Sequence, residues 1–150
     1  MGETTRLVFR KMTVADTSAV AALDRQCFGE RDAWSRADFF FAAKYPYCEF
    51  IVAELDGQIV ACAGIEFFHD GAEVQSLAVA PKFRCQGIGR RLLMMLLDAV
   101  KRRGLSTVIL EVRPSNTAAI KLYEDFGFQV VDRLKNFYLD EDALVMLRDL

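Results

Sequence analysis

A glycine-rich turn that leads directly into a long amphipathic helix constrains this chain more than any other feature. The turn spans residues 84–90 (RCQGIGR) and lies between a strand-like segment that ends at Val79 and a helical pattern that begins at Ile88. Helix starts expose unpaired N–H groups, and glycines let the backbone approach an anion closely. The turn therefore indicates either a phosphate-binding site or a tight turn with solvated arginines.

Two common phosphate-binding motifs do not fit this turn. A Walker A loop requires Lys and then Ser or Thr after its last glycine, whereas Arg90 and Arg91 follow Gly89 here. A Rossmann fingerprint requires a third glycine, which is absent at this place. We therefore expect neither a typical nucleotide triphosphatase nor an NAD-dependent enzyme.

Length and charge predict one domain that does not bind nucleic acid or membranes. The chain has 150 residues, of which 53% are hydrophobic, and we expect residues 1–150 to form a single domain. Its formal net charge of −2 lacks the basic excess of a nucleic-acid binder. The segment 1–6 has no apolar signal region, and the longest apolar run, residues 92–97, is too short to cross a bilayer. We predict a cytoplasmic protein.

The cysteines do not form a metal site in this sequence. Cys27, Cys48, Cys62 and Cys85 are widely spaced, and the chain has one histidine. Zinc sites need closely spaced cysteine or histidine pairs. We expect reduced, mostly buried thiols and no metal.

Hydrophobic periodicity predicts a mixed α/β or α+β domain. Hairpins in the first half, one of them at Asp56-Gly57, precede a strand-helix-strand crossover in the second half. We expect helices to start near Thr13 or Asp16, at Trp34-Ser35 and at Ile88, and a fourth to run from an N-cap at Ser115 through Phe126. The predicted strands are 7–10, 49–55, 58–68, 72–79, 107–112, 128–131 and 143–147.

The turn and its flanks resemble the GNAT acetyltransferase superfamily. The pattern R-x-x-G-x-G is preceded by L-A-V-A-P at residues 77–81 and followed by two leucines. The resemblance implies a GNAT-like fold, with a central, mostly antiparallel mixed sheet of six to seven strands flanked by about four helices. It also implies a strand bulge near the acetyl thioester, and a loop whose amides hold the pyrophosphate of acetyl-CoA. The cofactor-binding residues that it implies are Leu77, Ala78, Val79, Arg84, Cys85, Gln86, Gly87, Ile88, Gly89, Arg90, Asn116 and Tyr123.

A second stretch is similar to one group within that superfamily, the RimI ribosomal-protein-alanine N-acetyltransferases. It reads LEVRPSNTAAIKLYEDFGF at residues 110–128, and it is supported by Trp34-Ser35 and by residues 133–138 (RLKNFY). The resemblance implies transfer of an acetyl group from acetyl-CoA to the N-terminal α-amine of a protein, the alanine of a small-subunit ribosomal protein. It further implies that Trp34, Arg133 and Tyr138 bind the acceptor.

Acetyl transfer to an amine needs a base, because an α-amino group has a pKa of about 7.7 to 8.0 and is largely protonated near neutral pH. Glu111, at the end of a predicted strand, is the candidate, either directly or through water. Burial can raise the pKa of a carboxylate toward the working pH. The alternative for Glu111 is a structural ion pair with Arg113 or a neighbouring lysine at a solvated strand end.

The leaving thiolate of CoA benefits from a proton donor, and the resemblance assigns that role to Tyr123. Its alternative is ordinary packing with Leu122 and Phe126 at helical spacing. Asn116 either binds the CoA arm, as the resemblance implies, or caps its helix.

The acceptor stays open between several classes. The loop predicted at residues 139–142 is shorter than the resemblance leads us to expect, which bears on the shape of the acceptor pocket. A lysine side chain, a polyamine, an amino acid or another small amine are alternative acceptors. A non-catalytic acyl-CoA-binding module is the alternative from a different functional class.

Overall fold

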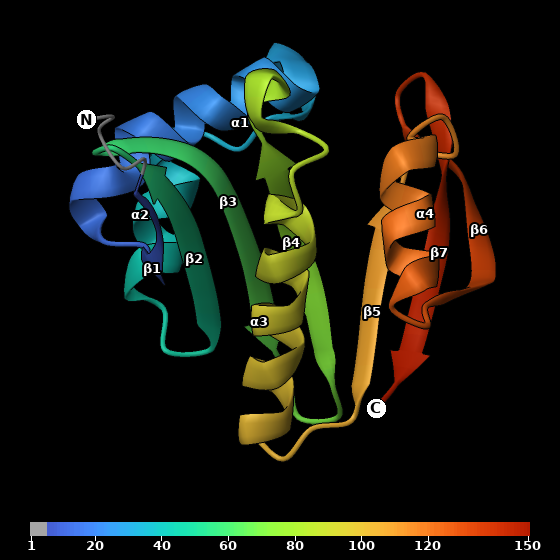
Figure 1. Ribbon diagram of the computed structural model, residues 1–150. Coiled ribbons are helices and arrows are strands. Elements are labelled where there is room, and N and C mark those ends of the chain that lie inside the picture. The colour runs from blue at the N-terminus through green and yellow to red at the C-terminus, as the bar shows by residue number, and fades with distance from the viewer. Residues whose placement is uncertain (1–5) are drawn as a thin grey trace.

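One seven-stranded sheet, with the order β1-β2-β3-β4-β5-β7-β6, organises the computed structural model, which describes residues 6–150 (Figure 1). All neighbouring strands are antiparallel except β4 and β5, which are parallel. The predicted mixed, mostly antiparallel sheet is confirmed. Residues 1–5, part of the segment used to predict the location of the protein, lie outside the described residues. The strands are β1 (Leu7–Lys11), β2 (Cys48–Leu55), β3 (Gln58–Phe67), β4 (Ala72–Val79), β5 (Thr107–Val112), β6 (Gln129–Tyr138) and β7 (Glu141–Asp149).

Four α-helices cover the two faces of the sheet, two on each face. They are α1 (Thr17–Asp32), α2 (Arg36–Lys44), α3 (Ile88–Arg102) and α4 (Thr117–Asp125). Side chains of β2 alternate between two cores: Phe50 and Val52 pack with α1 and α2, whereas Ile51 and Ala53 pack with α3 and its surroundings. Two short 3₁₀ helices, η1 (Val14–Asp16) and η2 (Pro81–Phe83), precede α1 and α3.

Helix starts follow the local sequence signals, with one exception. Asp16 accepts a hydrogen bond from the Thr13 amide at 2.8 Å, and the Ser35 hydroxyl accepts one from the Asp38 amide at 3.1 Å. The prediction of Ser115 as the N-cap of the fourth helix is wrong. Asn116 caps α4 by accepting from the Ala119 amide at 3.2 Å, because Ser115 is bonded instead to Glu141.

The last two strands are longer than the sequence predicts. β6 continues to Tyr138 and β7 begins at Glu141, so a two-residue turn replaces the four-residue loop predicted at 139–142. β6 is an edge strand whose side chains are mostly exposed, and it therefore lacks the alternation that marks a half-buried strand.

Strands β4 and β5 separate after a very short pairing. Only Ala72 with Val108 and Glu73 with Ile109 are in register, after which the two strands diverge (Figure 1). The register of β4 against β3 shifts between Gly64 and Ile65, which leaves Gln75 unpaired as a bulge. The bulge that the family resemblance implies is therefore present, and a gap opens in the middle of the sheet.

The four cysteines form no disulfide in this fold. All four cysteines are free thiols: Cys62 is buried, Cys27 and Cys48 are partly buried, and Cys85 is exposed. Between residues 6 and 150, no helix combines the length and the apolar character that a membrane crossing requires.

The core beside the bulge is sensitive to one added methyl group. A Cβ at Gly64 would lie 2.1 Å from the Phe50 ring, which is 3% exposed and packs against Trp34 and Phe39. We expect Gly64→Ala to lower the free energy of unfolding by about 1–3 kcal/mol in urea denaturation. Gly89→Ala is the control, because its Cβ would meet Val79 at an ordinary 3.6 Å. Equal stability of Gly64→Ala and wild type would contradict this packing.

Candidate active site

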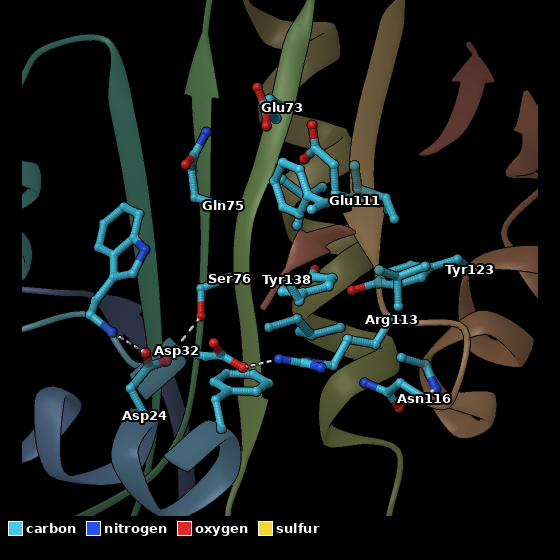
Figure 2. A pocket seen from close by; sticks show the side chains of 18 residues that line it. Asp24, Asp32, Glu73, Gln75, Ser76, Glu111, Arg113, Asn116, Tyr123 and Tyr138 are labelled. Atoms are coloured by element: carbon cyan, nitrogen blue, oxygen red, sulfur yellow. Dashed lines mark hydrogen bonds and ion pairs between the residues drawn. The ribbon is translucent and has the colours of Figure 1, made fainter. Parts of the chain in front are cut away.

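A cavity of about 320 Å³ occupies the gap between β4 and β5. This volume is within the range of small-molecule sites. Its walls come from the end of α1, the bulged part of β4, the end of β5, the start of α4 and the β6–β7 hairpin (Figure 2). Six residues that the sequence singled out line it together: Trp34, Leu77, Glu111, Asn116, Tyr123 and Tyr138.

A buried carboxylate fixes the wall formed by α1 and β4. Asp24 is 3% exposed and accepts hydrogen bonds from the Trp34 amide at 2.8 Å and from the Ser76 hydroxyl at 3.3 Å (Figure 2). Burial raises the pKa of Asp24, and the two hydrogen bonds act in the opposite direction. Asp24 thus ties the segment before α2 to the bulged strand. The sequence analysis did not select Asp24, because its sequence context does not distinguish it from an aspartate on the exposed face of a helix.

Glu111 faces a second carboxyl group, that of Glu73 on β4 (Figure 2). Burial raises the pKa of Glu73 to about 7, and a hydrogen bond to Glu111 together with the charges of Glu111 and Glu66 acts in the same direction. Two carboxyl groups in such contact share a proton more readily than they both ionise. The cavity therefore contains a carboxyl that titrates near neutral pH. The sequence reasoning missed Glu73, although a polar residue between the buried Ala72 and Val74 was a signal.

The alternative that Glu111 forms an ion pair with Arg113 is wrong. Arg113 donates to Asp140 at 2.8 Å, to Glu141 at 3.2 Å and to Asp32, and its guanidinium stacks on the Tyr138 ring at 4.1 Å. Its side chain extends away from Glu111, toward Asp32 at the end of α1 (Figure 2).

Tyr123 packs in the core and also lines the cavity. It is 7% exposed and packs edge-on against Phe128 at 5.8 Å, as a core residue does. Its hydroxyl nevertheless points into the cavity (Figure 2). Burial raises the pKa of Tyr123, with a further contribution from Tyr138, so its proton is retained at neutral pH.

The charge of the cavity favours a cation. Four carboxyl groups line it, those of Asp24, Asp32, Glu73 and Glu111, against one guanidinium that is already paired. An ammonium group is therefore a better ligand for this wall than an anion.

The glycine-rich turn lies beside the cavity rather than in its lining, on the side of α3. Gly87 is the N-cap of α3 with φ +83°, a conformation that favours glycine, and no side chain caps this helix. The amides of the first helical turn have no partner within a helix, and the space above Gly87 is open on its Cβ side. Arg84 donates to the Val79 carbonyl at 2.9 Å, which fixes the turn against β4.

Several of the predicted site residues have side chains that are buried or already ion-paired. Ile88 and Ala78 are buried in the two cores, so only their backbones face outward. Arg90 pairs with Asp125 of α4 at 3.0 Å. Arg133 pairs with Asp142 at 2.7 Å and does not line the cavity, in contrast to Trp34 and Tyr138. Over residues 6–150, no group of three or more possible ligands could hold a metal ion.

The comparisons with known proteins agree with this geometry. The model of the acetyltransferase (GNAT) family matches residues 17–128. The ribosomal protein bS18-alanine N-acetyltransferase of Escherichia coli K12 is 38% identical over 117 residues, which are 75% of this chain and 78% of that protein. The N-alpha-acetyltransferase RimI of Mycobacterium tuberculosis is 38% identical over 144 residues, which are 92% of this chain and 89% of that protein.

A solved structure shows the same fold. The crystal structure of the ribosomal-protein-S18-alanine N-acetyltransferase from Escherichia coli superposes with a TM-score of 0.85 and 30% sequence identity, covering 96% of this chain and 94% of that one. The chain therefore belongs to the GNAT family of acetyltransferases, in the group of RimI N-acetyltransferases.

Proposed function

We propose that this enzyme transfers the acetyl group of acetyl-CoA to the N-terminal α-amine of a protein, the alanine of a small-subunit ribosomal protein. The observation that carries the proposal is the cavity between β4 and β5, which Glu111 and Tyr123 both line together with other carboxyl groups. The relatives named for bS18-alanine acetylation support the choice of acceptor. The proposal includes two expectations from the sequence: residues 1–150 form a single domain, and the protein is cytoplasmic, in the same compartment as the proposed acceptor.

The turn before α3 is the proposed site for the diphosphate of acetyl-CoA. Unpaired amides at a helix N-terminus and the left-handed conformation of Gly87 suit a diphosphate. Gly89 has no side chain, so the backbone of the turn can approach the ligand closely. Gln86, Arg90 and Cys85 flank it, and their backbone amides belong to the same turn. Leu77, Val79 and Asn116 are the proposed contacts for the pantetheine arm, whose acetyl end would then reach the gap beside the β4 bulge.

The acceptor amine is proposed to enter from the side of α1, past the carboxyl groups of Asp24 and Asp32, and to reach Glu111 on β5. Glu111, directly or through a water molecule, takes the proton that the ammonium must lose. The nitrogen then bonds to the acetyl carbon and loses its second proton to water. The carbon–sulfur bond breaks, Tyr123 gives its proton to the sulfur, and Tyr123 afterwards regains a proton from solvent. Glu73 sits beside Glu111 as a second proton-holding group. Trp34 and Tyr138 are proposed to bound the acceptor pocket, whereas Arg133 would act only at its outer rim.

The test of the acceptor class is thiol release from acetyl-CoA with a panel of amines. We expect turnover with a peptide that has a free N-terminal alanine. We expect little turnover with an N-blocked peptide that contains a lysine, and little with spermidine. Turnover confined to lysine or spermidine would contradict the N-terminal assignment and retain the acetyltransferase. Tight CoA binding without turnover of any amine would contradict catalysis and favour the binding module.

The two proposed catalytic groups are tested by removing only their proton chemistry. Glu111→Gln and Tyr123→Phe should each lower kcat by about 10²-fold or more, because general acid–base catalysis typically contributes 10² to 10⁴. Calorimetry should find acetyl-CoA affinity nearly unchanged. Glu124→Gln, an exposed change on α4, is the control and should keep wild-type turnover. An undiminished kcat in either variant would remove that residue from the mechanism.

The proton held by Glu73 is tested through folding stability, which needs no substrate. Its pKa is raised from 4.5 to about 7 in the folded protein, so the folded state binds more protons than the unfolded state between these values. Stability should therefore fall as the pH rises through this window. We expect wild type to lose about 1–2 kcal/mol relative to Glu73→Gln between pH 5 and pH 8, a value reduced for the partial exposure of the group. Identical pH profiles in urea denaturation would show that Glu73 has an ordinary pKa.

A further inference from the structure

The β6–β7 hairpin is paired at its tip, where Tyr138 lies opposite Glu141, but its pairing is irregular in the residues just before the tip. The register between the two strands is irregular between Leu134 and Tyr138, and Asn136 adopts φ +54°. β6 is also an edge strand with mostly exposed side chains, so no neighbouring strand or core fixes its outer side. The position of Tyr138 at this tip therefore depends on side-chain contacts.

Arg113 supplies those contacts from the end of β5. Its guanidinium bonds Asp140 at 2.8 Å and Glu141 at 3.2 Å, and it stacks on the Tyr138 ring at 4.1 Å. Glu141 in turn accepts hydrogen bonds from the amide and the hydroxyl of Ser115, at 2.8 and 2.9 Å. The hairpin tip is thereby joined to β5 and to the segment that leads into α4.

The same guanidinium crosses the open end of the cavity. It pairs with Asp32 at the end of α1, on the opposite side of the gap between β4 and β5 (Figure 2). A second ion pair, Arg31 with Asp140 at 2.9 Å, joins the end of α1 to the tip of the β6–β7 hairpin. Because β4 and β5 share only two paired residues, these ion pairs are the contacts that close the gap on the α1 side.

We propose that Arg113 is a positioning residue for acceptor binding: it holds the β6–β7 hairpin, and with it Tyr138, against the end of α1, and so forms the acceptor wall. Both of its terminal nitrogens bond the carboxylates of Asp32, Asp140 and Glu141, and we assign its action to the hairpin that these bonds hold. The proposal rests on the proposed function, since it assigns the α1 side of the cavity to the acceptor.

Steady-state kinetics separate this role from simple stabilisation. Arg113→Met should raise KM for the acceptor peptide about tenfold, or about 1.4 kcal/mol, with kcat and KM for acetyl-CoA little changed. Arg113→Lys should restore part of the affinity, because an ammonium keeps the charge but lacks the planar fork that bonds several carboxylates. The control is Arg10→Met, which removes a similar cluster with Asp16 at 2.7 Å and Glu54 at 3.0 Å, on the strand farthest from the hairpin. An unchanged peptide KM in Arg113→Met would overturn the proposal.

A double-mutant cycle tests whether Arg113 acts through Tyr138. If it does, Arg113→Met combined with Tyr138→Ala should raise the peptide KM no further than Tyr138→Ala alone. Additive effects would contradict this route.

Amide hydrogen exchange tests the hairpin without any substrate. We expect Arg113→Met, and not Arg10→Met, to speed exchange at residues 136–142 at least about tenfold. Unchanged exchange there would overturn the proposal even if the enzyme acetylates the expected peptide. Faster exchange in a protein that does not acetylate any N-terminal alanine peptide would instead leave the positioning of the hairpin intact and contradict the proposed function.

Discussion

The early separation of β4 and β5 is the constraint on which the rest of the structure depends. Two parallel strands that stay paired leave no room between them, whereas these two share a single short contact at Ala72 and Glu73. The bulge at Gln75 turns β4 away, and the buried carboxylate of Asp24 holds the bulged segment and the start of α2 in place. Where two neighbouring strands separate, their backbone N–H and C=O groups lose their strand partners and are free to bond a ligand. α3 packs on the core that spans both parts of the sheet, and the ion pairs of Arg113 and Arg31 join the end of α1 to β5 and the hairpin across the gap, where we propose that the reaction takes place.

Charge divides that gap into two sides. The turn before α3 presents unpaired amides and arginines, which suit the phosphates of acetyl-CoA. The cavity wall presents the carboxyl groups of Asp24 and Asp32 from α1 and of Glu73 and Glu111 from β4 and β5, which suit an ammonium. An anionic co-substrate and a cationic acceptor would thus approach from opposite faces, and the acetyl carbon and the amine would meet where the two sides join. The contact between Glu73 and Glu111 places a proton-exchanging group at that point.

The sequence predicted most of the fold, because the elements that pack on the core carry strong periodicity. The bounds of β4, β5 and α3 were predicted to within a residue or two, since buried and exposed positions alternate clearly along them. β6 was predicted too short, because an exposed edge strand has no such alternation. For the site, motif resemblance selected Glu111 and Tyr123, which line the same cavity. It could not select Glu73, Asp24 or Arg113, whose importance comes from partners at distant sequence positions, such as Ser76 for Asp24 and Asp32 for Arg113.

The measurement that tests this account most directly is a crystal structure with a bisubstrate conjugate, in which the sulfur of CoA is joined through an acetyl group to the N-terminus of an alanine peptide. The account predicts that the diphosphate lies on the amides of residues 86–90, that the sulfur lies near Leu77 and Tyr123, and that the peptide leaves along the end of α1 and the β6–β7 hairpin. A peptide that leaves over α3 and α4, or a diphosphate bound away from the glycine-rich turn, would contradict it.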